Sequence, residues 1–214
     1  MQSEEGKKKF IITEDKFSEI LSNVLDFCAG EVEEIMYNNL MHRTIFELED
    51  SRPEKDIIQD GNKWIRIRVG DISCDRISQC TVTFKQRKHI EDKTNSSRFI
   101  AEDYYSVVQF FKDIGFKLVS EQETLRSKYV FYYESVKYII CFDKWPKLLE
   151  YIFVTITAED NISEEDFKQV CDLIKLPQLA TQVGYVDIDK AYLDKFNKTA
   201  RDFRHLRFDI PILS

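Results

Sequence analysis

Residues 143–157, which read DKWPKLLEYIFVTIT, are the most informative stretch of this chain. A Trp-Pro pair favours an extended or turn backbone before it. The residues that follow are rich in β-branched and aromatic side chains, which predicts a strand over 151–157. Alternate side chains of a strand point to opposite faces. One face therefore presents Ile152, Val154 and Ile156 and is expected to pack under helices, while the other presents Phe153, Thr155 and Thr157 and holds no carboxylate.

The same alternation upstream gives two strands a cationic side. In residues 64–69, WIRIRV, the isoleucines and the valine share one face while Arg66 and Arg68 share the other. In residues 81–85, TVTFK, Lys85 lies opposite the apolar face in the same way. On a closed barrel, such a face repeated on neighbouring strands could line a polar tunnel that suits a polyphosphate.

The remaining pattern predicts helices that flank mostly antiparallel strands, an α+β fold. Thr13 is a candidate cap for a helix that ends at Phe27, and residues 31–48 hold strand-like patches. Loops are expected at 49–62 and 88–97. The other predicted elements are a helix at 103–114 with Val107, Phe110, Phe111 and Ile114 inward and Gly115 as its cap, strands at 128–133 and 137–142 joined by a turn at 134–135, a helix begun by Ser163 with Phe167, Val170, Cys171 and Ile174 buried, and a helix at 187–196.

Composition indicates an ordered globular protein. Hydrophobic residues make up 43% of the 214 residues and aromatic residues 13%. The net charge of −7 gives no general attraction to nucleic acid or to anionic membranes. No apolar run approaches the roughly 20 residues that cross a bilayer. The five cysteines are scattered, which argues for reduced thiols, and the N-terminus lacks the apolar core of a signal peptide, so we expect a cytoplasmic protein with one domain over 1–214.

Five motifs, in this order, resemble those of the CYTH family, also called triphosphate tunnel metalloenzymes. The family includes class IV adenylate cyclases and thiamine-triphosphatase-like enzymes. The joint order and spacing of the motifs carry the resemblance. They are WIRIR at 64–68, TVTFK at 81–85, the helix that closes with IGF at 110–116, EQETLRSKY at 121–129, and DKWP at 143–146.

The resemblance implies a closed or nearly closed antiparallel β-barrel, the triphosphate tunnel, with flanking α-helices. It also implies that lysines and arginines clamp a nucleotide triphosphate or another polyphosphate. Glutamates would hold Mg²⁺ or Mn²⁺ for cyclisation or hydrolysis. The residues that match the family's phosphate clamp are Lys9, Arg66, Arg68, Lys85 and Arg126.

The acidic half of the family's motif is degenerate in this chain. Its N-terminal Glu-x-Glu-x-Lys aligns with residues 5–9, EGKKK, which keep Glu5 alone. The carboxylates expected around 96–101 are absent, and Glu102 is the nearest candidate. The late Glu pair falls on Phe153 and Thr155, or on Thr155 and Thr157, and threonine is a poor ligand for Mg²⁺. The metal candidates are therefore Glu5 and Glu102, which Asp143 could join.

Three functions remain open from the sequence. The first is a polyphosphate-binding tunnel with reduced or lost metal-dependent catalysis, a pseudoenzyme candidate. The second is an active, divergent class IV adenylate cyclase or triphosphatase that uses Mg²⁺ or Mn²⁺. The third is a vestigial tunnel that serves as a protein-interaction scaffold. A homodimer is left open as well.

Overall fold

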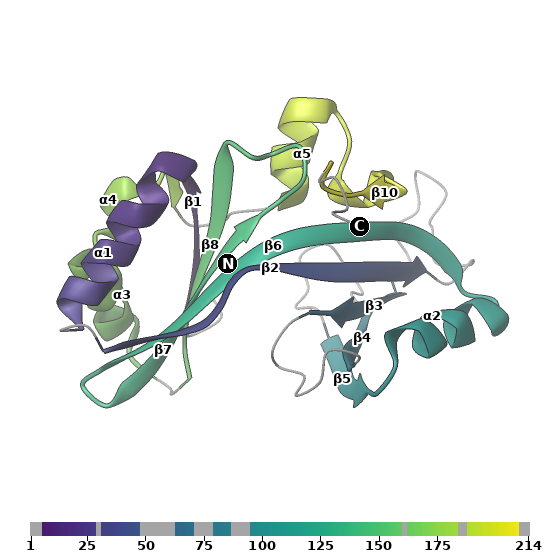
Figure 1. Cartoon of the computed structure of the whole chain (residues 1–214), viewed down its shortest axis with the longest axis horizontal. Helices are drawn as coiled ribbons and strands as arrows, with labels where there is room; N and C mark the ends of the chain where they lie inside the picture. The colour runs from purple at the N-terminus through teal and green to yellow at the C-terminus, as the bar shows by residue number, and fades with distance from the viewer. Residues whose placement is uncertain are drawn as a thin grey trace. The chain divides into compact units, whose positions relative to one another are not determined.

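The structure is a computed structural model that describes residues 6–28, 31–47, 63–70, 79–86, 95–159, 162–183 and 188–209. It has an α+β fold, with a large and mainly antiparallel sheet and several helices (Figure 1). The strands are β1 (Lys7–Thr13), β2 (Val32–Glu47), β3 (Lys63–Val69), β4 (Cys80–Gln86), β5 (Asn95–Ala101), β6 (Lys117–Tyr133), β7 (Val136–Lys144), β8 (Tyr151–Ala158), β9 (Gln182–Val183) and β10 (His205–Leu206). The helices are η1 (Glu14–Lys16), α1 (Phe17–Phe27), α2 (Tyr104–Asp113), α3 (Glu164–Leu173), α4 (Leu176–Leu179), α5 (Ile188–Phe196) and η3 (Ala200–Asp202).

The sheet is open among the described residues. Its strand order is β5-β4-β3-β2-β6-β7-β8-β1-β9, and β10 pairs with β6. No pairing of described residues joins the two end strands, β5 and β9, so the predicted closure into a barrel is not confirmed. No helix of the described part of the chain is long and apolar enough to span a membrane.

The chain divides into two compact units. Unit 1 comprises Met1–Asn39, Thr124–Asn197 and Ile210–Ser214, and unit 2 comprises Leu40–Glu123 and Lys198–Asp209. The long strands β2 and β6 each contribute one part to each unit. The single CYTH-like domain over 1–214 stays a prediction.

Unit 1 has its core where helices cover one face of the sheet. Figure 1 shows α1, α3 and α4 gathered on the same side of β1, β7 and β8. Ile152, Val154 and Ile156 of β8 are buried in this core, as their alternation predicted. Helix α3 is also confirmed, because Ser163 accepts a hydrogen bond from the N–H of Asp166, and the four predicted apolar side chains are buried.

The hairpin between β6 and β7 turns where the sequence predicted. Glu134 and Ser135 both have positive φ, 48° and 68°, as the two central residues of a type I′ turn require. Strand β6 is much longer than predicted, at 17 residues, because its first half carries charged and small polar residues rather than the apolar ones that mark a strand.

Unit 2 has a smaller core between the sheet and α2. Phe46, Ile65, Ile67 and Val82 pack there against Val108 of α2. Both predicted ends of this helix are confirmed, since Asp103 caps its first turn and Gly115 follows its last turn at φ +89°.

Several predicted elements need correction. Phe110 and Ile114 of α2 are more than half exposed, because Val108, Val107 and Phe111 form the packed face instead. Thr13 precedes the short helix η1 and makes no side-chain cap.

The strand-like patches at 31–48 form one continuous strand over the described residues, β2. The loop predicted at 88–97 is wrong from Asn95 onward, where β5 begins. Ser96 and Ser97 pair with β4 there, although their side chains are polar. The predicted loop at 49–62 and residues 88–94 lie outside the described residues.

Candidate functional site

Cations gather on one face of β2, β3, β4 and β5 in unit 2. Directly opposite residues of antiparallel strands share a face. Arg43 of β2 lies opposite Arg68 of β3, and Arg66 is two positions from Arg68 on the same face. Arg98 of β5 shares a cross-strand row with Arg66, through the intervening residue of β4. We call this face, with Arg43, Arg66, Arg68, Lys85 and Arg98, the cationic face.

Three arginines of the cationic face are partly buried, whereas Arg98 is exposed. The Nε atoms of Arg43, Arg66 and Arg68 are buried. An anion interacts more strongly with a partly buried cation than with an exposed one, because the local dielectric is lower. Arginine also offers a planar fork of donors that matches two oxygens of a phosphate group. The cationic face therefore has the chemistry of an anion site.

Trp64 adds an aromatic ring to the same face. It lies opposite Lys85, and the Lys85 Nζ is 5.9 Å from its ring centroid. The guanidinium carbon of Arg201, from η3, is 4.6 Å from the same centroid. Both distances fit cation–π contacts.

Sequence reasoning found Arg66, Arg68 and Lys85 but missed three cations of unit 2. Arg43 could have been found by continuing the alternation of Ile45 back along β2. Arg98 lies in a segment predicted as a loop. Arg201 reaches Trp64 across a separation that no local pattern encodes.

Lys9 and Arg126 share one face of unit 1. Lys9 of β1 lies opposite Thr155 of β8, and Arg126 of β6 lies opposite Asp143 of β7, which lies opposite Phe153 of β8. The structure therefore confirms that this face of β8 carries Phe153, Thr155 and Thr157 and not a carboxylate.

Asp143 is committed to Arg126. The Nε and Nη2 groups of Arg126 donate to the two carboxylate oxygens of Asp143, each over 2.6 Å. Both side chains are nearly buried, at 13% and 10% exposure. This bidentate pair balances one cation of the predicted clamp with an internal anion.

The structure describes Glu102 but not Glu5 among the predicted metal ligands. Glu5 lies outside the described residues, and Glu102 is exposed ahead of α2. Within the described ranges, no three His, Cys, Asp or Glu side chains are placed to hold a metal ion. The roles of Glu5 and Glu102 stay predictions.

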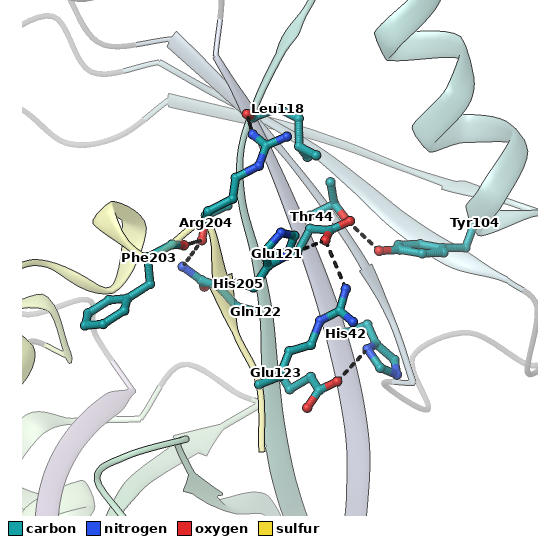
Figure 2. A network of polar contacts seen from close by, with 12 residues as sticks. His42, Thr44, Tyr104, Leu118, Glu121, Gln122, Glu123, Phe203, Arg204 and His205 are labelled. Carbon is teal, nitrogen blue, oxygen red and sulfur yellow. Dashed lines mark hydrogen bonds and ion pairs between the residues drawn. The ribbon is translucent and has the colours of Figure 1, made fainter. Parts of the chain in front are cut away.

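A polar network runs along the first half of β6 in unit 2 (Figure 2). Glu123 lies 3.6 Å from the Nδ1 atom of His42, and Glu121 lies 2.9 Å from the Nδ1 atom of His205. In the same network the hydroxyl groups of Thr44 and Tyr104 are hydrogen-bonded, and burial raises the pKa of the Tyr104 phenol. Sequence reasoning assigned no function to these residues.

The comparisons with known proteins show the fold. No family model and no curated protein matches the sequence. A proposed adenylate cyclase of Vibrio parahaemolyticus matches at 15% identity and a TM-score of 0.55, over 90% of this chain and 99% of that one. The PH1012 protein of Pyrococcus horikoshii OT3 matches at 17% identity and a TM-score of 0.50, over 79% of this chain and 89% of that one. The chain therefore shares its fold with these two proteins, one of which is a proposed adenylate cyclase.

Proposed function

We propose that this protein binds a nucleoside triphosphate or another polyphosphate through the cationic face, and that its metal-dependent turnover is reduced or lost. The observation that carries the proposal is the cross-strand arrangement of Arg43, Arg66, Arg68 and Arg98 on one face of unit 2. For Lys9 and Arg126, which lie in unit 1, the clamp role is proposed from the sequence resemblance alone.

The chemistry of the cationic face supports a ligand with several negative charges. Neighbouring cations on a sheet repel one another, and an anion that contacts two or three of them relieves that repulsion. A triphosphate offers oxygens to several arginine forks at once, whereas a single carboxylate satisfies one.

The composition of the β8 face supports the proposal that a divalent metal ion binds only weakly. Thr155 and Thr157 stand where the resemblance places carboxylates, and hydroxyl groups are poor ligands for Mg²⁺. The carboxylate of Asp143, which lies opposite Arg126, already pairs with it. A face that carries several cations attracts an anion and repels a divalent cation.

The experiment that tests binding is a calorimetric titration of tripolyphosphate and of ATP in EDTA, which removes divalent metal. We expect saturable binding. Because a charge-assisted hydrogen bond contributes about 1.5–3 kcal/mol, Arg66→Ala and Arg126→Ala should each weaken binding by about tenfold or more. Lys112→Ala is the matched control, since Lys112 is an exposed cation on α2. The absence of saturable binding by the parent protein would overturn the proposal and favour the scaffold alternative.

An active enzyme is the second candidate, favoured by the likeness to the proposed cyclase of Vibrio parahaemolyticus. ATP and tripolyphosphate incubated with Mg²⁺ and with Mn²⁺ separate the two candidates. A metal-dependent product that disappears in Arg66→Ala would show retained catalysis and refute the loss of turnover. We expect no product above the background of Arg66→Ala.

A further inference from the structure

We infer that Arg201 is a further phosphate-binding residue of the cationic face, and that Ser120 and Gln122 of β6 are positioning residues that hold it there. This inference rests on the proposed function and extends the ligand set to a segment that begins more than forty residues after the end of β8.

Arg201 lies over the face that carries the arginines. Its guanidinium carbon is 4.6 Å from the ring centroid of Trp64, and Trp64 shares its face of β3 with Arg66 and Arg68. A guanidinium stacked on a ring keeps its N–H donors at the edge of the stack, where they can meet phosphate oxygens. No carboxylate of the described residues pairs with Arg201, so these donors are not committed to an internal acid.

Two buried side chains of β6 fix the backbone on both sides of Arg201. The Gln122 Nε2 group donates to the carbonyl oxygen of Ala200 over 3.1 Å, and the Ser120 hydroxyl donates to the carbonyl oxygen of Phe203 over 2.7 Å. Figure 2 shows Gln122 beside the segment that carries Phe203 and Arg204. Ser120 is fully buried and Gln122 is 4% exposed.

Hydrogen bonds offset the cost of burying the polar side chains of Ser120 and Gln122. A buried amide or hydroxyl group costs free energy unless it is hydrogen-bonded. Both groups find their acceptors in the backbone that flanks Arg201, and Gln122 also donates to Ser120 over 3.2 Å. The two side chains thus form a small bracket whose geometric effect is to fix η3 over the sheet.

Side chains on the opposite face of β6 contact the same C-terminal segment a few residues beyond Arg201. Glu121 lies 3.0 Å from Arg207 and 2.9 Å from His205, and Glu123 accepts a hydrogen bond from the N–H of Phe208 over 2.9 Å. We call residues 199–208 the C-terminal strap. Because consecutive residues of β6 point to opposite faces, Ser120 and Gln122 hold the strap near Arg201 while Glu121 and Glu123 hold its end.

The turn that presents Arg201 is closed by its own cap. The carboxylate of Asp202 accepts hydrogen bonds from the N–H and the hydroxyl group of Thr199, over 2.7 and 2.8 Å. This capping box fixes the backbone of η3 on either side of Arg201. A fixed backbone lowers the entropy cost of placing the long arginine side chain on a phosphate.

The test is a double-mutant cycle in which the affinity for tripolyphosphate is measured without metal. Since a charge-assisted hydrogen bond is lost, Arg201→Ala should weaken binding by about tenfold. Gln122→Ala should weaken binding in the parent protein but have little further effect in the Arg201→Ala background, because the two residues act through one contact. Gln109→Ala is the matched control, since Gln109 is an exposed glutamine on α2.

A second readout follows the position of Arg201 without any ligand. In a Trp145→Phe background, Trp64 is the remaining tryptophan, so emission reports the ring on which Arg201 stacks. We expect Arg201→Ala and Gln122→Ala to shift this emission to the same extent and Gln109→Ala to leave it unchanged. If Gln122→Ala matched the parent while Arg201→Ala did not, Gln122 would not position Arg201.

The outcomes separate this inference from the proposed function. If the parent protein binds tripolyphosphate and Arg201→Ala binds it equally well, Arg201 is not a ligand, while the cationic face stands. If the parent protein does not bind tripolyphosphate, the proposed function fails and the role of Arg201 fails with it.

Discussion

Arg126 on β6 and Asp143 on β7 lie directly opposite each other, and two N–H groups of the guanidinium donate to the two carboxylate oxygens. Removal of one member of such a nearly buried pair leaves the other charge without its partner. We expect Asp143→Ala to lower the free energy of unfolding by about 3 kcal/mol, measured by denaturation in urea. The double variant Arg126→Met with Asp143→Leu is the control, and it should recover much of the loss because it removes both charges. Equal stability of Asp143→Ala and the parent protein would contradict the pairing.

Asp103 gives the stability a defined dependence on pH. The Ser106 hydroxyl donates to the Asp103 carboxylate and holds the pKa of that carboxyl below its ordinary value. A lowered pKa in the folded state stabilises the protein fully above the unfolded pKa of about 3.9, and this contribution is lost as the pH falls through the folded pKa. The melting temperature of Asp103→Ala should therefore lie below that of the parent protein at neutral pH, and the gap should narrow as the pH falls below about 4.

Asp103→Asn is the matched control for this pH dependence. Asparagine caps a helix without titrating, so the gap between Asp103→Asn and Asp103→Ala should stay constant with pH. A gap between the parent protein and Asp103→Ala that does not change with pH would show that the carboxylate makes no such contribution.

Thr155 and Thr157 allow the face of Lys9 to be tested without disturbing the core. Thr155 lies opposite Lys9 and Thr157 opposite Lys7, and both threonines are partly exposed, whereas Phe153 is buried. Two glutamates at these positions would neutralise the two lysines, so we expect Thr155→Glu with Thr157→Glu to weaken metal-free tripolyphosphate binding by about tenfold. The uncharged pair Thr155→Gln with Thr157→Gln is the control. An unchanged affinity of the glutamate variant would remove Lys9 from the ligand set.

Gly70 and Gly115 allow the cost of an added Cβ in a crowded position to be compared with the cost in an open one. Both have a left-handed φ, +88° and +89°, but a Cβ at Gly70 would lie 2.5 Å from the carbonyl oxygen of Leu40, while a Cβ at Gly115 meets nothing within 4 Å. Gly115→Ala should lower the free energy of unfolding by about 1 kcal/mol through backbone strain alone. Gly70→Ala should lower it by about 2–4 kcal/mol, because steric overlap adds to the strain. Urea denaturation measures both, and equal losses would contradict the close approach.

The sequence predicted best where a pattern is local. The alternation in residues 64–69 and 81–85 predicted β3, β4 and the sides to which Arg66 and Lys85 belong, and both strands are confirmed. The turn at 134–135 and the helix after Ser163 are confirmed for the same reason, since their signals lie within a few residues.

The apolar face of α2 shows where a local pattern fails. Phe110 and Phe111 are adjacent, so they point about 100° apart on a helix, and one of them must turn away from any narrow core. The helical periodicity of the sequence predicted that both rings point into the core. The ring of Phe111 packs against Phe46 of β2, which is distant in the sequence, with 5.9 Å between their centroids, whereas Phe110 is 56% exposed.

The candidate site was predictable in part. Its strands carry a cationic side that the sequence shows, but the opposition of Arg43 to Arg68 depends on the register between β2 and β3. The contact between Arg201 and Trp64 depends on the path of the C-terminal strap, which the bracket of Ser120 and Gln122 directs. Neither the strand register nor the path of the strap can be predicted from the periodicity of a single segment. The clamp roles of Lys9, Arg66, Arg68, Lys85 and Arg126 stay predictions.

The interleaving of the two units bears on how the chain can be shortened. Unit 1 is assembled from three stretches and unit 2 from two, so no single cut releases either one whole. A chain stopped after Asn197 would lack β10, which pairs with β6, and would lack the carbonyl groups of Ala200 and Phe203 that accept from Gln122 and Ser120. Such a fragment should precipitate or be digested quickly, and fragment mapping of ligand binding would then report misfolding instead of the location of the ligand.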